Sequence, residues 1–237
     1  PEDLERTTLV TGLDEATDFQ FLPDGRILFT EKGGAIKVYD NGVLNPQPMI
    51  TFTPATGGER GLTGLAIDPD FADNHYIYVA YTTGDNHDRL SRLTVDGNTI
   101  DPASEAVLME SPEISGSYHH GGSLAFGPDD KLYWGVGDNL YTPNSQSLSS
   151  MHGKIMRLDP SKYDPTDPAA TAPADNPFVN TPGAVPQIYA LGFRNPFRLT
   201  FTPNGKLLVG DVGGAAWEEL NIVTKGANYG WPLAEGP

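Results

Sequence analysis

Two adjacent histidines are the first candidates for chemistry in this sequence. Residues 118–122 read Tyr-His-His-Gly-Gly, and Asp138 ends a Gly-Val-Gly-Asp run further along the chain. Successive side chains of a strand point to opposite faces, so only one of the two histidines can face a given pocket. A carboxylate beside an imidazole fixes its tautomer and stabilises its charged form. His119 and Asp138 therefore suit a general base, while the alternative is a histidine that only packs in the core or at the surface.

Two further segments carry groups that suit ligand binding. Residues 191–196 read Leu-Gly-Phe-Arg-Asn-Pro, and Arg194 offers fixed donors for a carboxylate or a developing oxyanion. The alternative for Arg194 is a structural salt bridge between neighbouring sheets. Residues 210–219 combine a glycine-rich run with three acidic side chains, and exposed carbonyls with carboxylates suit calcium. The spacing differs from an EF-hand, and the sequence contains no P-loop, nucleophile-elbow or zinc-protease motif.

Four copies of one pattern, a strand, a tight turn and a second strand, must position these residues. The turns contain Pro23, Pro69, Pro128 and Pro203, each followed by Asp or Asn. Proline presets the first turn angle, Asp or Asn tolerates the next, and the flanking runs are rich in β-branched and aromatic residues. Repeats of this size, without a helical period, predict an all-β fold, a β-propeller of four-stranded antiparallel blades, with a β-sandwich as the alternative. The proline-rich stretch 159–182 predicts a long loop.

The candidate residues occupy equivalent places in two repeats. His119 lies just before the third pattern and Arg194 just before the fourth. Loops that lead into blades gather at one mouth of a propeller. We therefore expect His119, Asp138, Arg194 and Asn195 to line one mouth, with His119 rather than His120 facing the axis.

Composition narrows the class of protein. The chain has 237 residues and no cysteine, which excludes disulfides, zinc–thiolate sites and a cysteine nucleophile. Its formal charge of −16 disfavours nucleic acid and anionic membranes and suits small neutral ligands or cations. No apolar run approaches the roughly 20 residues of a membrane span. These features fit an exported protein, periplasmic or extracellular, and fit a cytoplasmic protein from a salty habitat equally well.

Several segments together resemble the soluble quinoprotein glucose/sorbosone dehydrogenase family. The resemblance extends from about Glu31 to the C-terminus, in order. A broader branch of that family, which includes Hedgehog-interacting-protein-like propellers, is similar as well. The segments that carry the resemblance are residues 59–71, 119–122, 137–138, 153–159, 175–178, 191–196 and 228–232.

The resemblance implies a six-bladed propeller that holds pyrroloquinoline quinone (PQQ) and calcium and oxidises an aldose at its anomeric hydroxyl. It implies that His119 is the base and that Asp138 orients it. It also implies that Arg194 and Asn195 bind the quinone and polarise its reactive carbonyl. The remaining implied positions are Glu59 near the active site, the Gly213 and Gly214 carbonyls on the cofactor's calcium, and Glu219 with the Tyr229 carbonyl on a second calcium.

Two departures from the family pattern keep a second reading open. Val212 and Glu59 each stand where the sugar dehydrogenases carry glutamine. The chain, read as a single domain over residues 1–237, holds about four blades, so a C-terminal segment or a second chain is expected to complete the ring. The alternative function is a non-catalytic, calcium-stabilised propeller that binds a glycan or a protein. For the enzyme, the expected partners are a sugar substrate and an electron acceptor.

Overall fold

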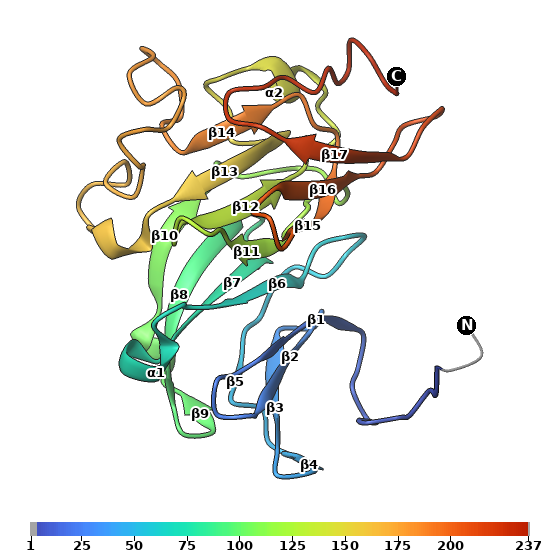
Figure 1. The fold of residues 1–237 in the computed structure, drawn as a ribbon, viewed down its shortest axis with the longest axis vertical. Helices are drawn as coiled ribbons and strands as arrows, with labels where there is room; N and C mark the ends of the chain where they lie inside the picture. Colours follow the sequence, from blue (N-terminus) through green and yellow to red (C-terminus); the bar gives the residue numbers. More distant parts are fainter. Residues whose placement is uncertain (1–3, 237) are drawn as a thin grey trace.

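Four antiparallel sheets follow one another along the chain, and the first two strands of each are joined by one of the predicted proline turns (Figure 1). The structure is a computed structural model that describes residues 4–236. The sheets are arranged as four blades of a β-propeller, which confirms the predicted fold class. Helix is limited to short turns in the described residues: α1 (Phe71–Asn74), α2 (Pro143–Gln146), and the 3-10 turns η1 (Pro102–Ser104) and η2 (Pro160–Lys162).

The strands of each blade run in chain order, apart from small additions. The first sheet contains β1 (Ala16–Phe21), β2 (Ile27–Glu31), β3 (Ala35–Asp40), β4 (Val43–Leu44) and β5 (Ile50–Thr51). The second contains β6 (Leu62–Ile67), β7 (Tyr76–Thr82), β8 (Asp88–Asp96), β9 (Thr99–Ile100) and β10 (Ala106–Glu110). The third contains β11 (Leu124–Phe126), β12 (Leu132–Val136), β13 (Lys154–Leu158) and β14 (Ile188–Leu191). The fourth contains β15 (Pro196–Phe201), β16 (Leu207–Asp211) and β17 (Glu219–Val223). Only the third sheet has the four strands expected of every blade.

The same main-chain hydrogen bond closes three of the four proline turns. It runs from the N–H of the residue before proline to the carbonyl three residues after it. These bonds are Leu22 N to Arg26 O, Gly127 N to Lys131 O and Thr202 N to Lys206 O. In the second sheet the corresponding bond, Asp68 N to Tyr76 O, spans a longer turn that contains α1. The long loop expected at residues 159–182 is also present, and its only regular element is η2.

A separate hydrophobic core fills the space between each pair of neighbouring sheets. The first strands lie against one another in order, β1 against β6, β6 against β11, and β11 against β15. Strand β12 shows how one sheet serves two cores: Leu132 and Trp134 pack with the second sheet, while Tyr133 packs with the fourth. Alternate side chains of a strand point to opposite faces, so an inner sheet is buried on both sides.

Trp134 tests this description of the core. Its side chain is almost fully buried, and its indole N–H has no hydrogen-bond partner in the described residues. We expect Trp134→Ala to lower the free energy of unfolding by about 3–5 kcal/mol, because it leaves a large cavity. Trp134→Phe should cost less than about 1.5 kcal/mol, since it keeps an aromatic ring and loses no hydrogen bond. Urea unfolding followed by circular dichroism measures both, and equal costs would contradict this packing.

The outer faces of the first and last sheets carry exposed apolar side chains. Phe19 and Phe21 lie on β1, and Leu220 and Ile222 lie on β17. A row of four blades that is not closed into a ring leaves two such sheet faces, and the segment or chain expected to cover them stays a prediction. Within residues 4–236, no helix has both the length and the apolar character needed to cross a membrane.

Candidate active site

Blade geometry brings the candidate residues to one end of the sheets. Because β11 pairs antiparallel with β12, the start of β11 and the end of β12 lie at the same edge. His119 lies in the segment that leads to β11, and Asp138 follows β12. In the next blade, Arg194 and Asn195 precede β15 in the same way. Equivalent loops of neighbouring blades therefore lie side by side.

His119 and Asp138 form a buried hydrogen-bonded pair. His119 Nδ1 lies 2.7 Å from Asp138 Oδ1, and the Asp138 carboxylate is fully buried. The carboxylate accepts, so Nδ1 carries the proton and Nε2 is the free basic atom of the ring. Two further donors hold Asp138: the indole Nε1 of Trp231 at 2.8 Å and the Leu140 N–H at 2.9 Å. The carboxylate is thus fixed on both oxygens.

Glu59 joins the histidine to the neighbouring blade. One oxygen, Oε2, accepts the His119 N–H at 2.8 Å and the Asn195 amide Nδ2 at 3.0 Å. The side-chain oxygen of Asn195, Oδ1, in turn accepts the Gly121 N–H at 3.1 Å. The Asn195 amide is therefore oriented by two partners, and Glu59 holds the backbone of His119.

Asp211 holds the backbone of Arg194 and Asn195, a function that the sequence analysis missed. Its two oxygens accept the Asn195 N–H at 2.6 Å and the Arg194 N–H at 3.0 Å. Burial raises the pKa of Asp211 to about 6, against the opposing effect of these two amides. Asp211 ends β16 just as Asp138 follows β12, each after a glycine. The repeated Gly-Asp dipeptide could have identified Asp211 as a site residue from the sequence.

Trp231 connects the two halves of the site and was also missed as a site residue. Besides bonding Asp138, its ring lies 5.5 Å from the Arg194 guanidinium carbon, a cation–π contact. Arg194 Nη1 donates to the Val212 carbonyl at 3.0 Å. We call Glu59, His119, Asp138, Arg194, Asn195, Asp211 and Trp231 the site network.

His120 points to a different set of partners from His119. Its Nδ1 lies 2.9 Å from Asp88 Oδ1, at the start of β8 in the second sheet. His152 Nε2 lies 3.6 Å from the other Asp88 oxygen. Burial alone would raise the pKa of Asp88, but the two histidines lower it below its ordinary value. The adjacent histidines thus serve separate clusters.

The positions expected to bind calcium lie in two places. Gly214 packs against the Trp231 ring and the Arg194 side chain, so the 213–214 turn borders the site network. Glu219 and Tyr229 line a separate pocket of about 340 Å³. Within residues 4–236, no three acidic or histidine side chains are grouped to hold a metal ion. The calcium ligands that the resemblance implies, backbone carbonyls and the Glu219 carboxylate, stay predictions.

Comparison with known proteins identifies the family. The profile of the Glucose / Sorbosone dehydrogenase family matches residues 13–236. The chain belongs to this family. Quinoprotein glucose dehydrogenase B of Acinetobacter calcoaceticus is 30% identical to this chain, over 99% of this chain and 54% of that protein. Human Hedgehog-interacting protein is 30% identical over 80% of this chain and 30% of its own length.

A solved structure of a dehydrogenase has a similar fold. The PQQ-bound form of aldose sugar dehydrogenase from Streptomyces coelicolor superposes with a TM-score of 0.84 at 31% identity. The match covers 97% of this chain and 66% of that one. The chain thus spans about half to two thirds of the length of these two dehydrogenases.

Proposed function

We propose that this protein takes part in the PQQ-dependent oxidation of an aldose sugar at its anomeric hydroxyl. The observation that carries the proposal is the buried His119–Asp138 pair, held in one network with Asn195 and Arg194. The family membership and the PQQ-bound relative support it. Removal of a hydroxyl proton requires a positioned base, and a histidine held by a buried carboxylate provides one.

His119 Nε2 takes the proton of the anomeric hydroxyl in this proposal. Asp138 keeps the proton on Nδ1 and stabilises the imidazolium that forms. When bound, PQQ supplies the acceptor for the hydride that leaves the sugar's C1. The sugar thus loses one proton and one hydride and becomes a lactone.

The donor set around Arg194 fits an anionic quinone. Nη1 of the guanidinium donates to the Val212 carbonyl, and the Trp231 ring lies 5.5 Å from the guanidinium carbon. Its remaining N–H groups have no protein acceptor within residues 4–236. Its other N–H groups suit a carboxylate or a quinone oxygen. Asn195 and Glu59, which bond to each other and to the backbone around His119, complete the cofactor-binding set in the proposal.

Calcium is part of the proposal at two places. The Gly213 and Gly214 carbonyls would hold the cofactor's calcium, and Glu219 with the Tyr229 carbonyl would hold the second. Hard oxygen donors of this kind favour calcium over softer metals. The proposed setting is periplasmic or extracellular, with an electron acceptor that reoxidises the quinol and with further blades from another segment or chain.

Reconstitution tests the proposed function. Protein loaded with PQQ and Ca²⁺ is assayed by dye-linked oxidation across a panel of aldoses. Turnover with at least one aldose that depends on both PQQ and Ca²⁺ is the expected result. Quinone that binds without turnover, or no binding at all, would favour the alternative function. That alternative, a calcium-stabilised propeller that binds a glycan or a protein, has its support in the likeness to Hedgehog-interacting protein.

Trp231→Phe tests whether the Trp231 indole N–H supports the His119–Asp138 pair. The change removes the donor to Asp138 Oδ2 but keeps an aromatic ring near Arg194. We expect sugar oxidation to slow about tenfold, the scale of one hydrogen bond to a charged group. Phe21→Leu is the control for the change of an aromatic ring, because Phe21 is 65% exposed on β1, away from the site network and the proposed calcium positions. Equal activities in the two variants would remove Trp231 from the account.

A further inference from the structure

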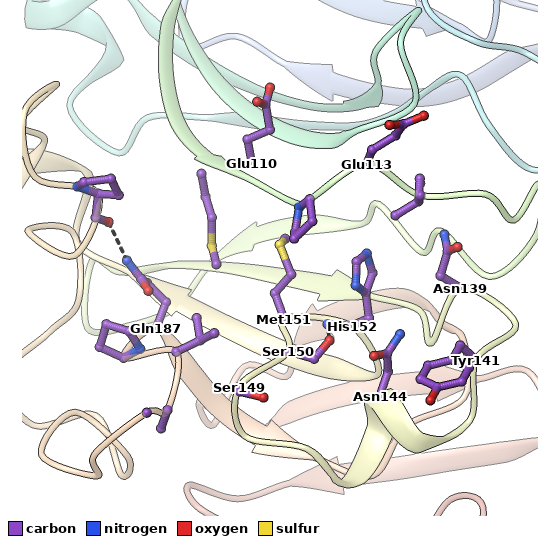
Figure 2. A pocket seen from close by; sticks show the side chains of 18 of the residues that line it. Glu110, Glu113, Asn139, Tyr141, Asn144, Ser149, Ser150, Met151, His152 and Gln187 are labelled. Atoms are coloured by element: carbon purple, nitrogen blue, oxygen red, sulfur yellow. Dashed lines mark hydrogen bonds between the residues drawn. The ribbon is translucent and has the colours of Figure 1, made fainter.

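A second pocket lies outside the site network. It has a volume of about 730 Å³ and is lined by residues from three stretches, 109–115, 139–152 and 168–187 (Figure 2). The volume is within the range of small-molecule sites, about 300–1,000 Å³. No member of the site network lines it, although Asn139 directly follows Asp138. The pocket is therefore a neighbour of the proposed active site and not part of it.

One end of this pocket carries a polar group that lacks a partner. Asn139 is 8% exposed, and its Nδ2 has no hydrogen-bond partner in the described residues. The orientation of the amide is fixed, because Oδ1 accepts the Gly116 N–H at 3.2 Å. Asn139 also has a left-handed φ of 59°. A buried unpaired donor costs about 1–3 kcal/mol, so the Asn139 amide is built to meet an acceptor in the pocket.

His152 adds a second buried polar group at the same end. Figure 2 shows its ring near Asn139 and Asn144, with Gln187 at the opposite end of the pocket. His152 is 5% exposed, and its Nε2, 3.6 Å from Asp88 Oδ2, is also without a hydrogen-bond partner. A ligand hydroxyl both donates and accepts, so one such group can serve an amide N–H and an imidazole together.

The rest of the lining selects against charge. Met109, Ile114 and Met151 give the pocket an apolar wall. Glu110 and Glu113 also line it; Arg89 pairs with Glu110, and the exposed carboxylate of Glu113 disfavours an anionic ligand. An ammonium group only donates and cannot serve the Asn139 N–H, so a cation is disfavoured at that end as well. A ligand that fits is uncharged, presents hydroxyl oxygens to the Asn139 end and places an apolar face on the methionines. Carbohydrates combine hydroxyl groups with C–H faces in this way.

We infer that this pocket binds a neutral mono- or disaccharide at a site separate from the site network. Asn139 Nδ2 donates to a sugar oxygen, and His152 contacts the same or the adjacent hydroxyl. The inference concerns binding only and holds whether or not the protein oxidises sugars. Asn139 N–H also bonds the His119 carbonyl at 3.2 Å, so an occupied pocket contacts the segment that carries the base.

Binding of sugars that lack a free anomeric hydroxyl tests the inference. Trehalose and methyl α-D-glucopyranoside are titrated into the cofactor-free protein by isothermal titration calorimetry, with glucuronate as the anionic comparison. We expect the neutral sugars to bind and glucuronate to bind at least tenfold more weakly. Binding of neither neutral sugar, or tighter binding of glucuronate, would overturn the inference.

Two variants locate the bound sugar. Asn139→Asp keeps the acceptor for Gly116 and replaces the unpartnered donor by an acceptor, so the affinity should fall at least tenfold. Ala184→Trp fills the pocket that Ala184 lines and should abolish binding. Ala103→Trp, at an exposed alanine outside the pocket, is the matched control and should bind as the unaltered protein does. Circular dichroism confirms that each variant is folded.

His119→Asn separates this pocket from the site network. Loss of sugar binding in His119→Asn, with binding retained in Ala184→Trp and Asn139→Asp, would place the sugar in the site network and contradict the inference. The opposite pattern supports it. Because the sugars used cannot be oxidised at C1, failure of the proposed dehydrogenase activity leaves this result unaffected.

Discussion

His119→Ala is expected to lower the turnover number of aldose oxidation by about 100-fold or more, the scale for loss of a general base. KM for the sugar should change far less, because the proton moves only as the transition state is reached. The measurement is dye-linked oxidation by protein reconstituted with PQQ and Ca²⁺. Asp138→Asn should lower turnover as well, since an amide can donate to Nδ1 and favour the wrong tautomer.

His75→Asn is the matched control for the loss of a histidine. His75 is exposed in the turn after α1, where its φ of 59° suits asparagine. The control should keep full activity. Turnover by His119→Ala within threefold of the unaltered protein would exclude His119 as the base and leave the pair with a structural function only.

Asp211→Ala should lower the free energy of unfolding by about 3 kcal/mol at pH 7. It removes the acceptor of two backbone N–H groups, and an unpaired buried donor costs about 1–3 kcal/mol. The loop that carries Arg194 and Asn195 should then lose its position, so activity should fall with stability. Chemical unfolding and the dye-linked assay measure the two effects on the same samples.

The pH dependence of stability gives Asp211 a distinct signature. Its pKa in the folded protein is about 6 because of burial, above the ordinary value of about 4 in the unfolded chain. Between these two values the folded state binds the extra proton, so the contribution of Asp211 to stability falls as pH rises from about 4 to 6. Asp211→Asn cannot titrate and should flatten that slope. An unchanged slope in the variant would contradict the assignment.

The fold was predictable because its signals are local. Each Pro-Asp or Pro-Asn turn sits between strands that pair within a few residues, as Leu22 and Arg26 do. The site was less accessible for the opposite reason. Glu59 and Asn195 are 136 residues apart in the chain, and Trp231 reaches Asp138 over 93 residues. No local sequence pattern predicts such contacts. The resemblance identified Glu59 and Asn195 as site residues, but it implied no role for Trp231.

Asp211 shows a different limit. The residue types at 210–219 predict calcium binding. In the structure, the Asp211 carboxylate instead accepts two backbone N–H groups. The sequence alone does not distinguish a carboxylate that accepts backbone N–H groups from one that binds a cation. The calcium positions at Gly213, Gly214, Glu219 and Tyr229 stay predictions for the same reason, since the direction of a carbonyl is not written in the residue type.

The separate cores between successive sheets have a consequence for folding during synthesis. Each core needs only one sheet and the next along the chain, so the first can form when the second sheet has left the ribosome, while later sheets are still being made. The site network forms later. Glu59 bonds Asn195 and Asp138 bonds Trp231, and in each pair the second residue is synthesised long after the first. A nascent chain with two finished cores is therefore already folded over most of its length but has no assembled site network.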